Sequence, residues 1–146
     1  VFLFCLPERT CYNKPMENLL RLLIVTVALG GLAIAFYIRH KKRHAETLVC
    51  PLNSNCETVI HSQYSTFLGL PLELWGLGYY GLVVFSYLIF MISAPLILWL
   101  TVFAFLFSLY LTYVQAAKLR EWCTWCLISA LFSSIIFLAS LALYYE

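Results

Sequence analysis

Residues 123–145 read CTWCLISALFSSIIFLASLALYY, and this stretch decides the class of fold. It contains no charged residue and is as long as the roughly 20 apolar residues that a helix needs to cross a bilayer. It closes on Tyr144 and Tyr145, and tyrosine gathers at the boundary between membrane and water. The stretch therefore predicts a membrane-spanning helix that opens with two cysteines.

The composition of the whole chain agrees with a membrane protein. Of its 146 residues, 63% are hydrophobic and 11% are charged, and the mean hydropathy is +0.88. Such a chain has too little polar surface to cover an exterior that faces water. A net charge of +2 gives no reason to expect a nucleic-acid partner, and the absence of Asp argues against a carboxylate metal site.

Three further stretches are long and apolar enough to span, at residues 19–38, 75–93 and 95–114. With residues 123–145 they predict an all-α integral membrane protein with four spanning helices. The loop at residues 39–74 and the turn at residues 118–122 must then emerge on the same membrane face, because two spans separate them. Four cysteines meet on that face, namely Cys50, Cys56, Cys123 and Cys126.

The long loop is predicted to cap the bundle. Ser54-Asn-Cys-Glu57 fits a capping box, which predicts a short helix at about residues 55–65. Gly69 and Pro71 predict a bend before the second span. Glu73 is expected at the membrane interface. The side chains of the short helix expected to face the bundle are Val59, Ile60 and Tyr64.

Residues 1–15 fit this scheme poorly and are expected to be an N-terminal extension of doubtful origin, with the membrane domain at residues 16–146. Met16 stands directly before the first span, as a natural start would. Cys5 and Cys11 precede that span, so with four spans they lie on the face opposite the other cysteines. We therefore expect both to be dispensable.

The four central cysteines form two pairs in sequence, Cys50 with Cys56 and Cys123 with Cys126. Thiol–disulfide exchange requires a thiolate that attacks, an accessible disulfide and a second thiol that resolves the mixed intermediate. A Cys-x-x-Cys at the start of a helix supplies these groups, because the helix N-terminus stabilises the thiolate. Two pairs on one face predict a relay of electrons from water to membrane.

Other interpretations of the cysteines remain open at this level. Four cysteines on one side could bind a structural zinc ion, although no metal site is predicted here because the Thr-Trp spacer at the mouth of an apolar helix is unlike an open zinc knuckle. Two inert disulfides could staple the loop to the bundle. In either case the chain would be a non-catalytic membrane subunit or scaffold.

The order and spacing of these motifs over residues 17–146 resemble the vitamin K epoxide reductase (VKOR) family. The matching features are a loop cysteine pair after the first span, Ser62 six residues past Cys56, and Cys-x-x-Cys opening the last span. The run from Ser62 to Pro71 is similar to bacterial members. The bacterial protein DsbB carries its cysteine motifs in the reverse order and is a poorer match.

This resemblance implies a quinone-dependent thiol oxidoreductase that drives disulfide formation. Cys50 and Cys56 would exchange with a separate thioredoxin-like (DsbA-like) protein, Cys56 would pass electrons to Cys123, and Cys126 would face the quinone. Animal members carry Tyr where this chain has Ala130, so menaquinone, ubiquinone or a related quinone is expected rather than vitamin K epoxide. The residues expected to contact the quinone are Ser62, Val59, Tyr64 and Phe67.

Two further expectations follow. The Ser62 hydroxyl could instead bond to the backbone of its own helix.

The orientation in the membrane is the second expectation. Lys and Arg are more numerous on the cysteine face, which by the positive-inside rule would be cytoplasmic. The resemblance implies the opposite orientation, in which disulfides persist outside the cell. The chain is therefore expected to be a multi-pass cell membrane protein with its cysteine face extracytoplasmic.

Overall fold

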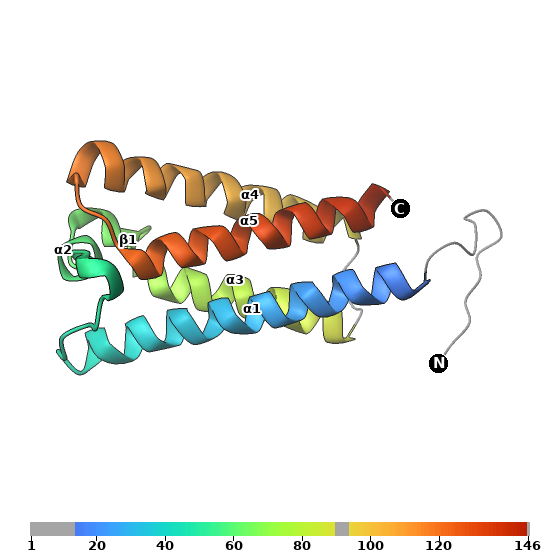
Figure 1. The fold of residues 1–146 in the computed structure, drawn as a ribbon, viewed down its shortest axis with the longest axis horizontal. Helices are drawn as coiled ribbons and strands as arrows, with labels where there is room; N and C mark the ends of the chain where they lie inside the picture. The colour runs from blue at the N-terminus through green and yellow to red at the C-terminus, as the bar shows by residue number, and fades with distance from the viewer. Residues whose placement is uncertain (1–13, 90–93, 146) are drawn as a thin grey trace.

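Four long helices lie side by side in the computed structural model, which describes residues 14–89 and 94–145 (Figure 1). They are α1 (Lys14–Arg43), α3 (Leu72–Ile89), α4 (Ala94–Tyr113) and α5 (Thr124–Tyr145). Each is long and apolar enough to cross a membrane. The predicted all-α membrane bundle is therefore confirmed. Cys5 and Cys11 lie outside the described residues, so the structure says nothing of their role.

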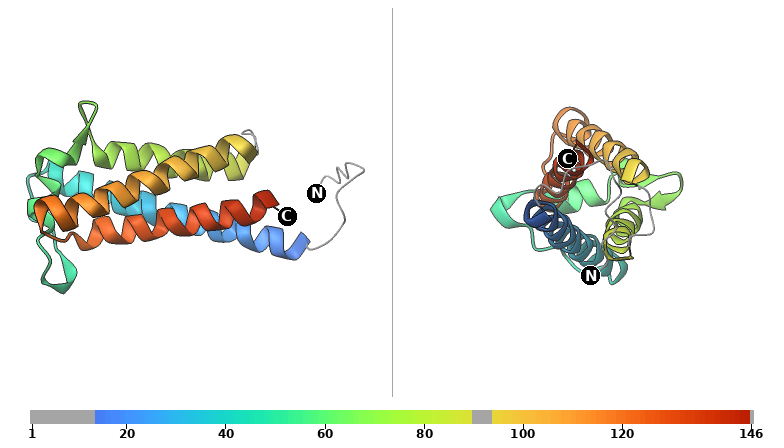
Figure 2. Two further views of the ribbon diagram at one scale, coloured as in Figure 1. Left: turned by 90° about the horizontal axis from the view of Figure 1, so that it is seen from above. Right: turned by 90° about the vertical axis from the view of Figure 1, so that its right-hand side faces the viewer.

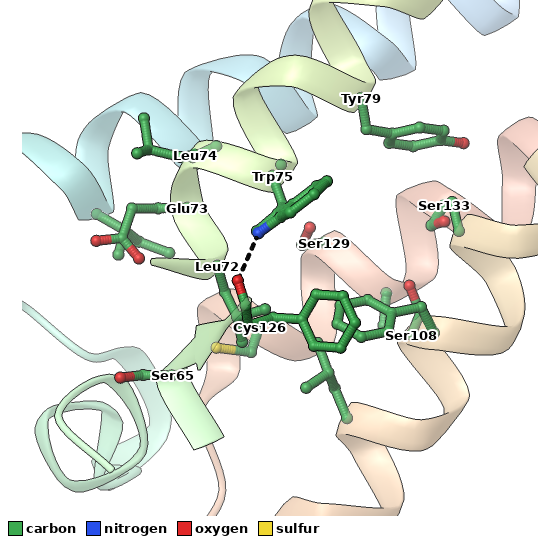
Figure 3. A pocket seen from close by; sticks show the side chains of 18 of the residues that line it. Ser65, Leu72, Glu73, Leu74, Trp75, Tyr79, Ser108, Cys126, Ser129 and Ser133 are labelled. Carbon is green, nitrogen blue, oxygen red and sulfur yellow. Dashed lines mark hydrogen bonds between the residues drawn. The ribbon is translucent and has the colours of Figure 1, made fainter. Parts of the chain in front are cut away.

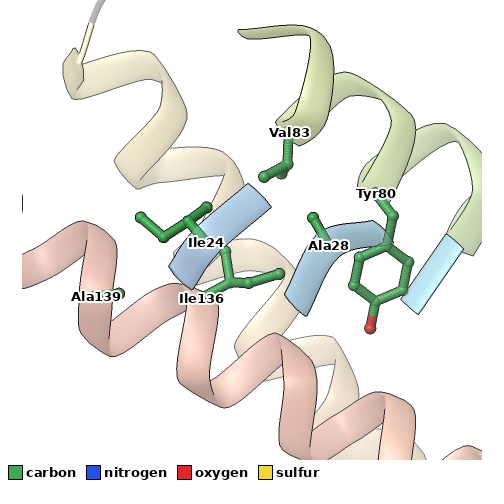
Figure 4. Close-up of a cluster of buried hydrophobic side chains, with 6 residues drawn as sticks. All are labelled: Ile24, Ala28, Tyr80, Val83, Ile136 and Ala139. Atoms are coloured by element: carbon green, nitrogen blue, oxygen red, sulfur yellow. The ribbon is translucent and has the colours of Figure 1, made fainter. Parts of the chain in front are cut away.

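The helices surround a small core and contact one another unequally. Helix α1 packs along α3 and α5, and α4 packs along α5, whereas α3 and α4 meet only briefly (Figure 2). The core lies where α1, α3 and α5 converge (Figure 4). Its fully or nearly buried side chains are Ile24, Ala28, Tyr80, Val83, Ile136 and Ala139. The bundle is thus closed on three sides and loosely joined on the fourth.

Gly31 in α1 allows a side chain of α3 to reach α5. A Cβ atom at Gly31 would lie 2.4 Å from the ring of Tyr80, so no larger residue fits beside this ring. The ring passes α1, and its hydroxyl donates a hydrogen bond to the carbonyl oxygen of Ser129 at 2.8 Å. This close approach connects α3 with α5, although the backbones of the two helices lie apart.

Two helices run further than the sequence predicted. Helix α1 continues to Arg43 rather than ending near residue 38. Its last turn carries basic residues, whose positive charge interacts favourably with the negative end of the helix dipole. Helix α4 continues into a π-helical segment, Val114–Leu119, which ends at Arg120 in a left-handed conformation (φ 52°). Both extensions lie at the end that carries the cysteines.

The loop between α1 and α3 folds into a cap of short elements. In order, they are the 3₁₀ turn Pro51–Asn53, α2 (Cys56–Ile60), the 3₁₀ turn Gln63–Ser65, β1 (Thr66–Phe67) and β2 (Leu70–Pro71). Helix α2 is thus shorter than the predicted helix at residues 55–65. The bend expected here is a hairpin in which Leu68 (φ 54°) and Gly69 (φ 78°) both have positive φ, as in the two-residue turns that suit twisted strands.

The predicted capping box at Ser54 and Glu57 is wrong. Asn55 occupies the N-cap position of α2, and no side chain caps this helix. The Ser54 hydroxyl instead contacts the Thr124 hydroxyl, and Glu57 Oε1 accepts the backbone N–H of Leu48 at 2.9 Å. Both side chains therefore bond to residues outside the four-residue pattern.

Candidate active site

The four central cysteines meet at the capped end of the bundle. Cys56 in α2 and Cys123, which directly precedes α5, are buried in one cluster, at 1% and 0% exposure. Cys50 and Cys126 pack against this cluster. All four residues therefore lie at the end of the bundle to which the number of membrane crossings assigned them.

The two pairs are in different redox states. Cys50 and Cys56 form a disulfide, whereas Cys123 and Cys126 are free thiols. Within the described residues, no three His, Cys, Asp or Glu side chains group as metal ligands would. The arrangement holds an oxidised pair and a reduced pair side by side, which is the pairing that thiol–disulfide exchange requires.

Cys123 occupies the N-terminus of α5, where backbone N–H groups point at its sulfur. Its Sγ accepts the thiol hydrogen of Cys126 at 2.8 Å and the backbone N–H of Cys126 at 3.4 Å. The hydrogen bond from the Cys126 thiol lowers the pKa of Cys123 most. Hydrogen bonds from the backbone N–H groups of Cys126 and Trp125 lower it further, whereas burial of the sulfur acts in the opposite direction. Cys123 is therefore the thiol of this pair that ionises more readily.

Gln115 holds the backbone at Cys123 in place, and the sequence analysis missed this role. Its side chain is buried at 4% exposure, and its Oε1 accepts the backbone N–H of Cys123 at 3.1 Å. Gln115 lies in the π-helical segment Val114–Leu119, a type of irregularity that is frequent at functional sites. A lone amide within an otherwise apolar stretch was the signal that could have identified it.

Three hydrogen bonds fasten the loop that carries the disulfide to the start of α5. The Thr124 hydroxyl lies 2.6 Å from that of Ser54 and donates to the carbonyl oxygen of Pro51 at 3.1 Å. The Trp125 indole donates to the carbonyl oxygen of Val49 at 2.9 Å. Thr124 and Trp125 are the two residues between Cys123 and Cys126, so the spacer of one pair holds the loop of the other.

A cavity of about 510 Å³ extends from the cysteines into the bundle (Figure 3). Its wall is mainly apolar and is built from all four long helices and the cap. Of the four central cysteines, Cys126 is the one that lines it. The cap side chains expected near a quinone also line it, and they are Val59, Ser62, Tyr64 and Phe67.

The Ser62 hydroxyl donates to the carbonyl oxygen of Val59 at 2.7 Å. This is the local backbone bond that the sequence analysis left open as an alternative. The same hydroxyl oxygen keeps its lone pairs for a further donor, and Ser62 remains in the cavity wall.

The bundle closes this cavity least on the side between α3 and α4, where these helices contact each other little. Trp75, Leu82 and Phe103 line the cavity and are also exposed on the surface, at 41%, 43% and 62%. The Trp75 indole donates to the carbonyl oxygen of Phe67 at 3.0 Å and so joins α3 to the hairpin (Figure 3). In a bilayer this side of the bundle faces lipid.

Glu73 lies in the first turn of α3 and has a partner that the sequence did not reveal. Its side chain is 7% exposed and lines the cavity, and one carboxylate oxygen is 3.3 Å from Lys42 Nζ. Lys42 reaches it because α1 runs past residue 38. Because α1 was expected to end earlier, the sequence analysis could not anticipate this ion pair.

One comparison with known proteins bears on this geometry. The family model described as the vitamin K epoxide reductase family matches residues 22–141, which is most of the chain. The match includes both cysteine pairs, the cap and all but the first turns of α1 and the last of α5.

Proposed function

This chain belongs to the vitamin K epoxide reductase family, and we propose from this that it carries electrons from a thioredoxin-like dithiol protein to a membrane quinone. Membership makes it an oxidoreductase that acts on thiols in a membrane. The donor, the acceptor and the role of each cysteine are the proposal. Its product would be disulfide bonds in the proteins that the thioredoxin-like partner oxidises.

The observation that carries the proposal is the position of Cys126. This thiol lines an apolar cavity inside the bundle, and Cys123 is buried in the same cluster as the loop cysteine Cys56. One end of the Cys123–Cys126 pair thus adjoins the loop disulfide, and the other adjoins a space suited to a lipid-soluble molecule. An inert staple would need no such cavity beside a free thiol.

In the first step, a partner thiolate attacks Cys50 of the Cys50–Cys56 disulfide. The S–S bond breaks, and the second partner thiol resolves the mixed disulfide, which leaves the partner oxidised and the loop pair reduced. Cys50 is partly exposed, and it lies between Val49 and Leu52, which are 71% and 89% exposed. These apolar side chains offer a partner a docking surface around the sulfur that it attacks.

In the second step, the Cys56 thiolate attacks Cys123 of an oxidised Cys123–Cys126 pair, and Cys126 leaves as a thiolate. Cys50 then attacks Cys56, which restores the loop disulfide and frees Cys123. The state with a loop disulfide and two free thiols at Cys123 and Cys126 is the one that this step produces. The lowered pKa of Cys123 makes it a good leaving thiolate here.

In the third step, Cys123 and Cys126 close to a disulfide and release two electrons to the quinone, which becomes quinol. The Cys126 thiol supplies one proton, and the second comes from solvent, because Cys123 reacts as a thiolate. The role of the protein is to hold Cys126 against the acceptor in a cavity from which bulk water is largely kept.

The cavity fits a quinone of the menaquinone or ubiquinone type. Its volume of about 510 Å³ lies in the range of small-molecule sites, and its wall combines apolar side chains with a few hydroxyls. The weak contact between α3 and α4 would give an isoprenoid tail a path into lipid. Cap residues Val59, Ser62, Tyr64 and Phe67 are proposed to contact the head group from the side of the cysteines.

The test is quinone reduction by purified protein in lipid, followed by quinone absorbance, with a reduced thioredoxin-like protein as donor. We expect turnover that requires both donor and protein and that is lost in Cys126→Ala. Ser134→Ala is a matched control on the same helix, since its hydroxyl bonds only within α5. If the wild type does not reduce quinone with either a protein or a small dithiol donor, the proposed function is wrong.

We further propose that the cysteine face is extracytoplasmic, where oxidised cysteines persist. A membrane-impermeant thiol reagent should label Cys50 in intact cells after mild reduction, because this residue is partly exposed once its disulfide opens. Cys50→Ala serves as the control for the labelled site. Labelling that appears only after lysis would reverse the proposed orientation.

A further inference from the structure

Three tyrosine hydroxyls of α3 extend toward three serine hydroxyls of α5, and one of the three pairs differs from the others. The pairs are Tyr80 with Ser129, Tyr87 with Ser140 and Tyr79 with Ser133. The first two are hydrogen-bonded, at 2.9 Å and 3.2 Å. In the third, Ser133 lies near the Tyr79 hydroxyl, but the two hydroxyls make no hydrogen bond of ordinary geometry. Both residues are labelled in Figure 3.

The hydroxyls of Tyr79 and Ser133 are both buried, and neither has another hydrogen-bond partner among the described residues. Ser133 is 2% exposed. A buried hydroxyl without a partner costs free energy, so folded proteins rarely retain one, and two at one place require an explanation. Both residues line the cavity, whereas neither Tyr87 nor Ser140 does. Tyr80 and Ser129 also line the cavity, but their hydroxyls bond to each other. Tyr79 and Ser133 are therefore the cavity-lining pair whose hydroxyls are not engaged with each other in a hydrogen bond of ordinary geometry.

On the basis of the proposed function, we propose that the Tyr79 and Ser133 hydroxyls together bind one carbonyl oxygen of the quinone, the one directed away from the cysteines. A carbonyl oxygen has two lone pairs and can accept both O–H groups. Both hydroxyls can donate, because no other group of the described chain accepts their hydrogens. The pair then fixes the depth and the direction of the head group.

The spacing along α5 suits this arrangement. Ser133 follows Cys126 by seven residues, which is two helical turns or about 10 Å along the axis. That length accommodates a quinone ring in contact with the Cys126 sulfur on one side and a hydrogen bond to the hydroxyl pair on the other. Ser129 lies between them in the cavity wall, but Tyr80 already engages its hydroxyl.

Equilibrium binding provides the direct test. A short-tailed ubiquinone is titrated into the protein while quenching of tryptophan fluorescence is followed, since Trp75 lines the cavity. We expect Tyr79→Phe and Ser133→Ala each to weaken binding about three- to tenfold, which is the usual loss for one neutral hydrogen bond. The double variant Tyr79→Phe/Ser133→Ala should lose no less than either single variant.

Tyr87→Phe and Ser140→Ala are matched controls, because they remove the same groups from the same two helices outside the cavity. Their quinone affinity should equal that of the wild type. Thermal unfolding provides a second distinction between the Tyr79–Ser133 pair and the Tyr87–Ser140 pair. Tyr87→Phe breaks an internal bond and should lower the melting temperature, whereas Tyr79→Phe removes an unpartnered hydroxyl and should leave it unchanged or raise it.

The outcomes distinguish this proposal from the function on which it rests. If the wild type binds and reduces quinone while Tyr79→Phe/Ser133→Ala binds it equally well, the hydroxyl pair is not the quinone site and the function stands. If Tyr79→Phe melts lower without losing affinity, the pair is structural. A wild type that neither binds nor reduces quinone overturns both proposals.

Discussion

The Ser54 hydroxyl lies 2.6 Å from the Thr124 hydroxyl, so the loop of one cysteine pair is bonded to the spacer of the other. Thr124 also donates to the carbonyl oxygen of Pro51, the residue after Cys50. Because these residues are far apart in sequence, the contact forms only when the cap is seated on α5. It couples the position of the loop disulfide to that of Cys123.

Thr124→Val should therefore slow electron transfer between the pairs. It keeps the shape of the side chain but removes both hydrogen bonds, at a cost of about 1 kcal/mol for each. We expect slower reduction of Cys123–Cys126 by the loop dithiol, measured by rapid quenching and thiol alkylation, with unchanged affinity for quinone. Thr101→Val is the control, since that hydroxyl bonds to its own helix at Leu98. Equal transfer rates in both variants would show that the contact is incidental.

Cys126→Ala and Cys50→Ala should stop the relay at different places. Without Cys126, Cys123 can only exchange with the loop disulfide at Cys56. The resulting Cys56–Cys123 disulfide cannot pass on to a Cys123–Cys126 disulfide, so it should persist in equilibrium with Cys50–Cys56, and quinone reduction should cease. Without Cys50, a small dithiol should still reduce Cys123–Cys126 and drive turnover, but the protein donor should not. Non-reducing peptide mapping and turnover with both donors measure these effects. Indistinguishable behaviour of the two variants would contradict an ordered relay.

The pKa of Cys123 should rise toward that of an ordinary thiol in Cys126→Ala, because this variant removes the first of the hydrogen bonds that lower it. In the wild type, the lowered pKa stabilises the folded state at pH values above the thiol pKa of the unfolded chain, about 8.5. This stabilisation is lost as the pH falls through the pKa of Cys123 in the folded state. Thiolate ultraviolet absorbance against pH, taken as the difference from Cys123→Ala, measures the midpoint. An unchanged midpoint would assign the shift to the helix N-terminus alone.

Gln115→Leu should destabilise the capped end by about 1–3 kcal/mol, because it leaves the buried backbone N–H of Cys123 without its acceptor. The same variant should slow transfer from Cys56, since the start of α5 is then less well held. Gln63→Leu, at an exposed position in the cap, is the control and should change neither quantity appreciably. Thermal unfolding and single-turnover transfer are the measurements. Wild-type stability in Gln115→Leu would mean that another acceptor replaces the amide.

The sequence predicted the architecture and the end at which the site lies because both depend on long-range averages. Four apolar stretches specify four spans, and the parity of crossings then assigns Cys50 and Cys123 to one face. Neither the number of spans nor the membrane face of the cysteines changes if a helix ends one turn earlier or later. The predicted helix ends were less accurate, since α1 was expected to end near residue 38 and continues to Arg43.

What the sequence could not predict depends on partners that only the folded chain brings together. Ser54 and Glu57 matched a local capping pattern, yet both bond to residues outside it. Glu73 was expected at the interface, and its burial depends on Lys42 of the extended α1. The hydroxyls of Tyr79 and Ser133 stand out only against the two bonded pairs beside them, a comparison that requires three-dimensional positions.

The loose contact between α3 and α4 has a kinetic consequence. A quinone that enters between these helices comes from the two-dimensional pool dissolved in the bilayer, not from the aqueous suspension. The relevant Michaelis constant is then a mole fraction of quinone in lipid. Adding quinone-free lipid to proteoliposomes should slow turnover by surface dilution, whereas adding buffer to the same vesicles should leave the rate per protein unchanged.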